Sequence, residues 1–557
     1  MTERRALICG LCELNDRGQR GFIPVRRREP QVQLHSRDRC ADDVTSIAET
    51  RMSDRGATMN QEGGKIIIVG GGIAGLCAGV YARRSGYEVD IFEKHDKPGG
   101  LATSWHRGDY TFETCLHWLL GSNPTSAMHD LWREVFDIDR LKFVDAKEFV
   151  RLESEHDERL SIFTNVDCME DELLRRAPED AVEIRHLANA VRRFGRVGML
   201  DPSGSWRHNL RAVFRMLPDL PALIRWSRLS SVEYGKRFSH PLLRRFFGTD
   251  EAASLSAAAL VFSLAWMSQR NAGYPIGGSQ AVIRLIVENL LRLGGRLRLG
   301  VEVQSIVVER NAAIGVRLAG GRTELADWVV SAADGHATIF KLLGGRFTDE
   351  TIIRRYDSMG TFPSYVQVSL GIARGFSDQP GYVTRVLDVP LAVDPGTELR
   401  EVSFRFFNFD PSFAPAGKTA VTCVLPTRNF EYWTNLRERG SAQYRLEKQR
   451  IAQTVIAILE RFVPDVRASI EVTDVSTPAT VIRYTGNWKG SMEGWLLTPA
   501  TGLRPFDGAL PGLHQFLMVG QWVMPGGGLP AGLMTARAAI HSICKHDRSA
   551  FAVRSAA

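Results

Sequence analysis

The chain has 557 residues, of which 44% are hydrophobic and 24% are charged, and its formal net charge is +7. These are the values of a globular protein, and the length exceeds that of one ordinary domain. No apolar run reaches the ~18 residues of a membrane-spanning helix, which excludes that class. No signature of a nucleic-acid-binding module occurs, so no nucleic acid partner is expected.

The first part of the chain, residues 1–62, has a basic run at 26–28, scattered acids and no sustained apolar period. That composition predicts a disordered extension, with Met1, Met52 and Met59 as alternative starts. Four residues in it are of the types that bind zinc, namely Cys9, Cys12, His35 and Cys40. Their spacing is loose, so no metal is expected. The eight cysteines of the chain are scattered and no secretory signal is found, which indicates a reducing compartment, the cytoplasm.

An apolar, β-branched stretch at residues 65–69 runs directly into a glycine turn and then a helix. In a dinucleotide site, Gly70 permits the tight turn, Gly72 lets backbone amides approach a pyrophosphate, and Gly75 lets the helix pack on the strand. The helix N-terminus then faces the phosphates with free N–H groups and a positive dipole end. The alternative is a glycine-rich turn of the kind that any α/β sheet contains.

The residues after the turn favour the dinucleotide site. They predict a helix from Ile73 to Ser85 and a second strand from Glu88 to Glu93. Glu93 stands about 20 residues beyond the glycines, where a carboxylate accepts hydrogen bonds from ribose hydroxyls. Strand, helix and acid together predict a β-α-β unit that binds a dinucleotide.

Further segments resemble, in the same order, the motifs of one flavoprotein family. They are residues 99–100, 108–121, 273–279, 301–306 and 519–532. Through them the chain resembles the FAD-dependent phytoene desaturases, carotenoid isomerases and retinol saturases of the amine-oxidase superfamily. The likeness extends from about Lys65 to Lys545, which is most of the chain.

The resemblance implies an α/β fold with a glutathione-reductase-like, FAD-binding Rossmann domain that is discontinuous in sequence, comprising residues 63–122, 273–345 and 505–547. Residues 123–272 are predicted to be mostly helical, and residues 346–504 are predicted to be largely strands. Together these two insertions are expected to form an α+β substrate domain with an antiparallel sheet and a helical lid.

The resemblance also implies FAD as the cofactor and assigns residues to it. These are Gly70, Gly72, Ile73, Ala74, Gly75, Glu93, Lys94, Gly99, Gly100, Leu101, Val303, Ala333, Gly520, Gly527, Gly528 and Leu529. Two positions depart from the family pattern. Glu113 and Thr114 stand where Asp and Gly are usual, and Gln521 or Trp522 replaces an acid. The first departure makes it unsafe to carry a substrate over from relatives.

The implied activity is that of an FAD-dependent oxidoreductase that desaturates, saturates or isomerises a hydrophobic polyene or isoprenoid, with hydride transfer to or from flavin N5. His117 and Glu493 are the candidate catalytic residues, and a structural hydrogen bond is the alternative for each. Two other functions are weighed against this one: a flavin amine oxidase, and a prenyl-binding escort of the GDI type that has lost its flavin. The electron acceptor is open between a quinone and oxygen.

The helical insertion contains a basic amphipathic segment within residues 207–245. Leu220, Leu223 and Ile224 recur at helical spacing, and Arg225, Trp226 and Arg228 are interleaved with them. This pattern is typical of a helix on an anionic membrane surface, and also of a core helix with a solvated basic face. A peripheral position on a membrane is therefore an expectation beside a cytoplasmic one.

Overall fold

The computed structural model describes residues 63–114, 116–196, 217–249, 255–501 and 505–553. The chain divides into two units, Met1–Gln61 and Glu62–Ala557, and the fold below is that of the second unit. The expected disordered extension and its cysteine and histidine set lie outside the described residues.

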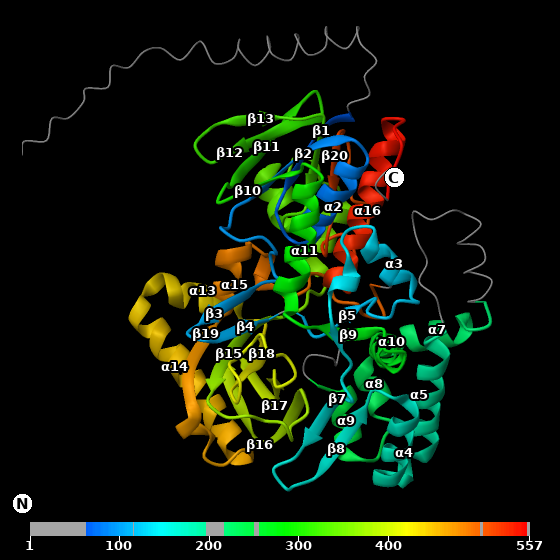
Figure 1. Cartoon of the computed structure of the whole chain (residues 1–557), viewed down its shortest axis with the longest axis vertical. Helices are drawn as coiled ribbons and strands as arrows, with labels where there is room; N and C mark the ends of the chain where they lie inside the picture. The colour runs from blue at the N-terminus through cyan, green and yellow to red at the C-terminus, as the bar shows by residue number, and fades with distance from the viewer. Residues whose placement is uncertain (1–62, 115, 197–216, 250–254, 502–504, 554–557) are drawn as a thin grey trace, which may run out of the picture. The chain divides into compact units, whose positions relative to one another are not determined.

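A five-stranded sheet, in which every neighbouring pair is parallel, forms the first half of this unit (Figure 1). Its strands, in spatial order, are β10 (Arg296–Leu299), β2 (Tyr87–Glu93), β1 (Gly63–Val69), β14 (Trp328–Ser331) and β20 (Phe516–Met518). The sheet thus collects strands from three distant stretches of the chain, as in the predicted discontinuous domain.

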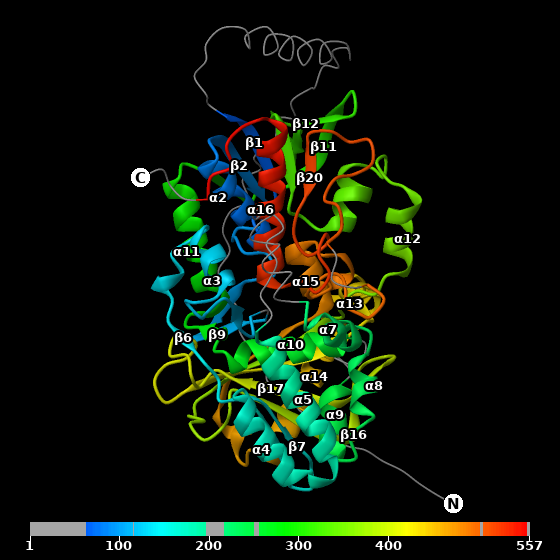
Figure 2. The ribbon, with the colours of Figure 1, turned by 90° about the vertical axis from the view of Figure 1, so that its right-hand side faces the viewer.

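Helices and a small sheet cover the two faces of this parallel sheet. Ile66 and Ile68 of β1 pack into the core shared with helix α2 (Ile73–Arg84), whereas Ile67 packs into a second core. A strand buried on both faces reads as a continuous apolar run, which is the pattern over the last four residues of β1, Ile66 to Val69. The covering elements are α2, α11 (Gly278–Arg292) and α16 (Gly528–His546), and a sheet of β11 (Val303–Glu309), β12 (Ala312–Leu318) and β13 (Thr323–Leu325). Figure 2 shows α16 lying lengthwise beside α2 and β1.

A seven-stranded sheet forms the second half. In spatial order it comprises β19 (Ile470–Ser476), β15 (Ser364–Ile372), β18 (Thr419–Thr427), β17 (Thr397–Phe406), β16 (Tyr382–Asp394), β7 (Glu148–Glu153) and β8 (Arg159–Phe163). All pairs are antiparallel except β16 with β7, which is parallel. The prediction that residues 123–272 are mostly helical missed β7 and β8, although Val150 and Leu152 alternate with polar residues there.

Helices pack against this sheet as well. The longest is α14 (Ser441–Phe462), whose Ile451, Val455 and Leu459 recur every four residues and enter the core of the sheet. The prediction of strands for residues 346–504 overlooked this helix. The other helices are α3 (Ala127–Arg133), α4 (Val166–Arg176), α5 (Ala181–Phe194), α7 (Leu220–Ser227), α8 (Ser231–Gly235), α9 (Pro241–Phe247), α10 (Ala257–Ser268), α12 (Glu350–Ser358), α13 (Phe430–Arg439) and α15 (Pro478–Thr485). Among the helices of the described residues, none is long and apolar enough to span a membrane.

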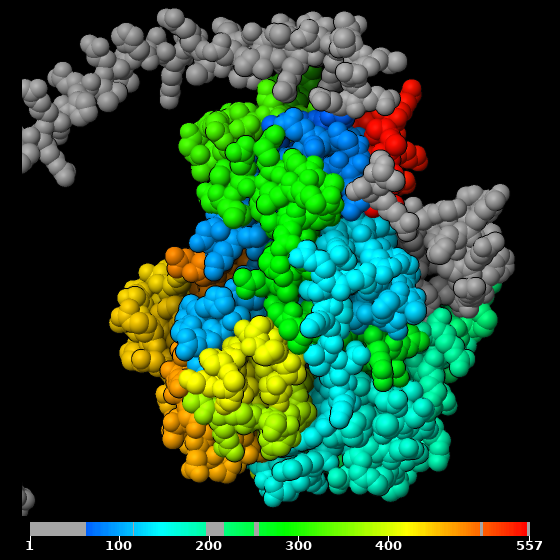
Figure 3. Space-filling model, viewed as in Figure 1, coloured from blue at the N-terminus to red at the C-terminus, as the bar shows by residue number. Residues whose placement is uncertain are grey.

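Short strands join the two halves. They are β3 (Ser104–Arg107), β4 (Tyr110–Glu113), β5 (Leu119–Leu120), β6 (Phe143–Val144) and β9 (Ala272–Pro275). The indole of Trp105 donates to Asp474 of β19 at 3.0 Å, and the hydroxyl of Tyr110 donates to Glu471 at 2.7 Å. In the space-filling view the blue β3–β4 hairpin accordingly lies against the orange segment that contains β19 (Figure 3). The chain that leaves the parallel sheet is therefore anchored on the edge of the large sheet.

Candidate functional site

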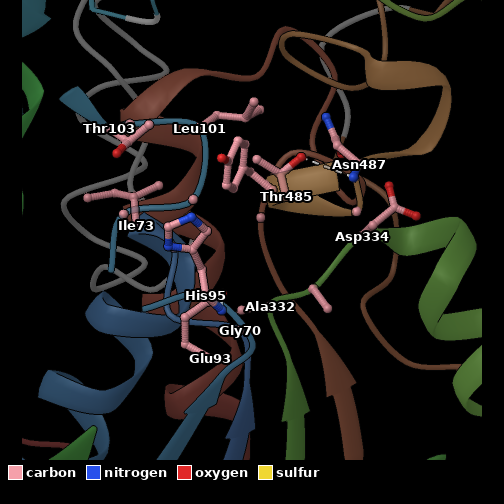
Figure 4. A pocket seen from close by; sticks show the side chains of 18 of the residues that line it. Gly70, Ile73, Glu93, His95, Leu101, Thr103, Ala332, Asp334, Thr485 and Asn487 are labelled. Atoms are coloured by element: carbon pink, nitrogen blue, oxygen red, sulfur yellow. Dashed lines mark hydrogen bonds between the residues drawn. The ribbon is translucent and has the colours of Figure 1, made fainter. Parts of the chain in front are cut away.

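A cavity of about 620 Å³ lies at the carboxyl ends of the parallel strands, where Val69, Glu93 and Ala332 line it. Ligands of open α/β sheets bind at this end of the strands. The cavity brings together these residues that the sequence assigns to the cofactor: Gly70, Gly72, Ile73, Ala74, Glu93, Lys94, Gly99, Gly100, Leu101, Val303, Ala333, Gly520, Gly528 and Leu529. Gly75 and Gly527 lie outside its lining. Figure 4 shows Ile73, Glu93 and His95 on one side of the cavity and Asp334, Thr485 and Asn487 on the other.

The three glycines of the first turn have different structural reasons. Gly70 has a positive φ, Gly75 is closely packed, and Gly72 borders an open space. A Cβ on Gly75 would lie 2.0 Å from the Gly70 carbonyl oxygen, and Gly70 itself has a φ of 100°. Gly72 has an ordinary φ of −73°, and a Cβ there would meet only Gly99 O at 3.8 Å and Gly100 Cα at 3.9 Å. The fold therefore does not require glycine at position 72, and the space that a side chain would enter belongs to the cavity.

Glu93, the predicted ribose acid, is buried and oriented by backbone amides. Its Oε2 accepts a hydrogen bond from the Gly71 amide at 2.7 Å, and its Oε1 accepts one from the His95 amide at 2.8 Å. Charge-assisted bonds of this kind hold a carboxylate in one orientation. The acid is thus fixed at the cavity wall beside the glycine turn.

The second glycine pair lies directly on the first turn. The Gly99 amide donates to the Gly71 carbonyl at 2.9 Å, and Gly72 and Gly99 form an isolated parallel bridge. Gly99 has a φ of 119°, and a Cβ there would lie 2.4 Å from the Ala102 carbonyl oxygen. Glycine at 99 is therefore required by the close approach of two backbone segments.

The late glycine segment brings the start of a further helix, α16, to the cavity. Gly528 and Leu529, at the start of α16, line the cavity. A Cβ on Gly532 would lie 2.7 Å from Ile73 Cγ2, so α16 packs closely on the start of α2. The Gly520 amide donates to Thr535 Oγ1 at 2.9 Å, which ties the end of the β20 strand to the same helix.

Asp334 is a cavity residue that the sequence prediction missed. Its carboxylate is buried and accepts hydrogen bonds from the amides of Ala337 at 2.7 Å and Trp488 at 2.8 Å. Burial raises its pKa to about 6, although these backbone amides act in the opposite direction. The sequence held one signal for it: an acid that follows a buried strand and precedes a helical turn is a typical helix cap.

Gln521 and Trp522, which replace the family's acid, bind Asn487 instead of projecting freely. Asn487 Oδ1 accepts hydrogen bonds from Gln521 Nε2 at 3.1 Å and from Trp522 Nε1 at 3.0 Å. All three residues line the cavity. Nothing local in the sequence indicates this contact, because it joins two segments of the chain that meet only in the folded protein.

Glu113, at the other departure from the family pattern, is a structural residue. It is buried, and its carboxylate accepts hydrogen bonds from the Tyr274 hydroxyl at 2.7 Å and from the Ser279 amide at 2.8 Å. Ser279 is in the first turn of α11, where backbone amides lack partners within the helix. Burial raises the pKa of Glu113, while the charge of Arg405 opposes the shift.

The two candidate catalytic residues lie in different places. Glu493 is half-buried and lines the cavity, and a Cβ on Gly527 would come within 2.7 Å of its Cβ. His117 does not line this cavity. Its ring lies 5.8 Å from that of Tyr382 and 6.0 Å from that of Trp118, centroid to centroid. The structure therefore does not bring His117 and Glu493 together at the cavity.

Three features of the cavity residues fit an FAD molecule. The side-chain-free approach at Gly72, the amides at the start of α2 and the oriented carboxylate of Glu93 are what a dinucleotide requires. Within the described residues, no group of three or more His, Cys, Asp or Glu side chains is placed to hold a metal ion.

Comparison with known proteins agrees with this geometry. The family model of the flavin containing amine oxidoreductases matches residues 73–489, which extend from the start of α2 through the first insertion and most of the second, and include most residues that line the cavity. The chain belongs to this family. It is thus an FAD-dependent oxidoreductase, and FAD is its cofactor.

Individual members of the family extend the comparison over most of the chain. The phytoene desaturase (neurosporene-forming) of Rhodobacter capsulatus is 27% identical, covering 85% of this chain and 92% of that protein. Prolycopene isomerase 1 of an Oncidium hybrid cultivar is 22% identical, covering 88% and 85%. Among solved structures, an oxidoreductase from Methanosarcina mazei is similar with a TM-score of 0.56 and 15% identity, covering 86% of this chain and 99% of that one. The last likeness shows that the two chains share a fold.

Proposed function

We propose that this flavoenzyme acts on a hydrophobic polyene or isoprenoid of the carotenoid type, by desaturation, saturation or cis-trans isomerisation. The observation that carries the proposal is the cavity wall on the side of the large sheet. There Trp105, Tyr365, Val481, Tyr484 and Met492 provide apolar and aromatic surface, beside the charged side chains of Arg107 and Glu493. The desaturases and isomerases of carotenoids among the relatives support the same substrate class.

In this proposal the parallel sheet and its glycine turns hold FAD. Bound FAD supplies hydride exchange with a substrate carbon at its N5. Glu93 would accept hydrogen bonds from the ribose, the amides after Gly72 would bind the pyrophosphate, and Val303 would contact the adenine. Gly528 and Leu529, at the start of α16, would hold the isoalloxazine end. The protein's further task is to position a C–C bond there and exclude water, for which a protein nucleophile is not required.

We assign the proton-handling role, where the reaction needs one, to Glu493. It is the catalytic candidate that lines the cavity, and it packs against Gly527 beside the start of α16. His117 is outside the cavity lining. Replacing Glu493 by Gln keeps its volume but removes the group that takes up and releases a proton, so a loss of turnover with unchanged FAD content would support the assignment.

The proposed division of the chain follows the sheets. Residues 63–122, 273–345 and 505–547 form the glutathione-reductase-like FAD domain, and residues 123–272 and 346–504 form the substrate domain. The parallel sheet draws its strands from the first set and the seven-stranded sheet from the second. We propose that the helices α4 to α10 act as the lid over the substrate.

We also propose that the lid meets a membrane surface, from which a polyene is taken. Leu217, Leu220 and Ile224 are large apolar side chains that are exposed, and Arg225 and Arg228 beside them are exposed as well. Such a face combines apolar insertion with attraction to anionic lipids. Trp226, which the sequence pattern placed in this face, is buried instead, because its ring packs 4.6 Å from that of Tyr234.

The second candidate is an amine oxidase, which the name of the family and the fold allow. The two are separated by adding amines to the FAD-loaded protein and measuring peroxide: release of peroxide with an amine would overturn the polyene proposal. The escort without a flavin is disfavoured by the intact glycine turns at Gly70, Gly72, Gly75 and Gly99.

The test is expression of the full chain in a carotenoid-producing host, with chromatographic analysis of the pigments. A changed desaturation or isomer pattern is expected for the wild type and not for Gly72→Val. Unchanged pigments, together with a protein that carries FAD, would exclude the carotenoids of that host as substrates.

A further inference from the structure

Two segments of the chain meet at the rim of the cofactor cavity. Residues 94–97 follow directly on Glu93, and residues 484–486 are the end of α15 and its C-terminal cap. All seven residues line the cavity, and Lys94 and Tyr484 are also exposed to solvent. Residues that border both the cavity and the solvent mark its mouth, so this part of the mouth adjoins the predicted ribose acid.

The rings of His95 and Tyr484 pack against each other at this rim. Their centroids are 5.0 Å apart at an interplanar angle of 57°, which is the geometry of an aromatic pair. A second contact lies beside it, since a Cβ on Gly486 would come within 2.8 Å of Lys94 Nζ. Figure 4 shows His95 and Thr485 on opposite sides of the cavity. The two segments therefore join the two sides of the cavity at its mouth.

The two rings are held in different ways. The His95 amide donates to Glu93 Oε1 at 2.8 Å, and the His95 carbonyl accepts the Gly300 amide at 2.9 Å, so this side of the contact is fixed by the backbone. Tyr484 is 46% exposed at the end of its helix. Its ring contributes little to a core, and its packing on His95 is an interaction that crosses the cavity.

We propose that His95 and Tyr484 form an aromatic bridge over the adenosine half of bound FAD, and that this bridge must open for the cofactor to enter or leave. An acid in the position of Glu93 accepts hydrogen bonds from the ribose, and Glu93 is itself bonded to the His95 amide. The ribose is thereby placed next to the bridge. The inference goes beyond the proposed function, because it concerns the retention of FAD and is independent of the substrate.

The experiment measures FAD exchange by the full chain in both directions. For release, the protein is loaded with radiolabelled FAD and chased with an excess of unlabelled FAD; for uptake, the apoprotein is mixed with FAD and the change in flavin absorption is followed. We expect Tyr484→Ala to accelerate release and uptake alike, by about threefold to tenfold, which is the scale of one aromatic contact. Tyr484→Phe keeps the ring and should exchange FAD at the wild-type rates. Leu446→Ala, which removes a 58% exposed side chain of α14 outside the cavity lining, is the control and should also leave both rates unchanged.

A double variant tests whether the contact between the rings is responsible. His95→Ala should accelerate exchange as Tyr484→Ala does, and the double variant should exchange FAD no faster than either single variant, because all three lack the same contact. Effects that multiply in the double variant would overturn the inference, and so would wild-type rates in Tyr484→Ala. Faster release with unchanged uptake would overturn it as well, since Tyr484 would then bind FAD without closing the mouth. If one alanine variant does not fold, the rates of the other decide the matter.

Discussion

The amide of Gly71 donates to Glu93 Oε2 at 2.7 Å, which joins the glycine turn after β1 to the acid at the end of β2. Because the Gly71 carbonyl also accepts the Gly99 amide at 2.9 Å, one residue links three motifs of the cofactor site. The site is therefore preorganised by the protein's own backbone, and its parts should respond differently to substitution.

Gly72→Val should yield a folded protein without FAD. A Cβ at this position meets no protein atom closer than 3.8 Å, so the side chain would occupy the cavity and not the core. The measurement is the ratio of FAD to protein by absorbance, with circular dichroism as the test of folding. Gly440→Val, at a half-buried helix junction with no atom within 4 Å of the new Cβ, is the matched control and should bind FAD normally. Normal FAD content in Gly72→Val would refute the placement of the pyrophosphate.

Gly75→Ala should destabilise the protein itself. The added Cβ would lie 2.0 Å from the Gly70 carbonyl oxygen, so α2 must move away from β1. The expected loss is about 3 kcal/mol of unfolding free energy or more, measured by urea denaturation. A variant as stable as the wild type would show that α2 packs differently from the structure.

Glu93→Ala should weaken FAD binding by about tenfold to a hundredfold, because the charge-assisted hydrogen bonds to the ribose are lost. The amides of Gly71 and His95 also lose their acceptor. Dissociation constants come from titrating the apoprotein with FAD. Glu93→Gln should bind more tightly than Glu93→Ala, since the amide oxygen still accepts one bond; equal affinities for both variants and the wild type would contradict the assignment.

Asp334 should make stability depend on pH between about 4 and 6. Its pKa is raised by burial from 3.8 to about 6, so the folded protein favours the protonated form. The contribution of Asp334 to the free energy of unfolding is fully present below pH 3.8 and is lost as the pH rises through 6. It amounts to roughly 1.4 kcal/mol for each unit of the pKa shift. Urea unfolding of the wild type and of Asp334→Asn at several pH values isolates the contribution of Asp334, because the two proteins share all other titratable groups. Parallel curves for the two proteins would contradict the prediction.

Replacing exposed leucine and isoleucine on α7 should weaken membrane association. Leu220→Ser combined with Ile224→Ser removes apolar surface that is 41% exposed at each position, and pelleting with anionic liposomes should fall severalfold. Leu446→Ser is the control, since Leu446 is 58% exposed on α14, outside the proposed lid. Equal pelleting of the wild type, the double variant and Leu446→Ser would contradict the membrane proposal.

The elements that could be predicted from the sequence are those with a strong local period. The observed β1, α2 and β2 differ from the prediction by at most two residues at any end, the largest difference being the start of β1 at Gly63. By contrast, α14 has an apolar period that was overlooked, and β7 is short and lies among helices. The pairing of β7 with β16 depends on a partner more than 200 residues away, so no local pattern specifies it.

The sequence by itself determined that a dinucleotide binds near Gly72, because a strand, a glycine turn, a helix and an acid at fixed spacing are all local features. The further motifs that resemble one flavoprotein family, from residues 99–100 to 519–532, then indicated FAD and the family. Only the tertiary structure decided how the rest of the cavity is built. In the cavity, Asn487 bonds to Trp522 and Asp334 bonds to Trp488. Outside it, Arg405 holds the His117 backbone from 288 positions away. Side chains of these types form such contacts only when packing of the two sheets brings them within hydrogen-bond distance, and that packing is a property of the whole chain.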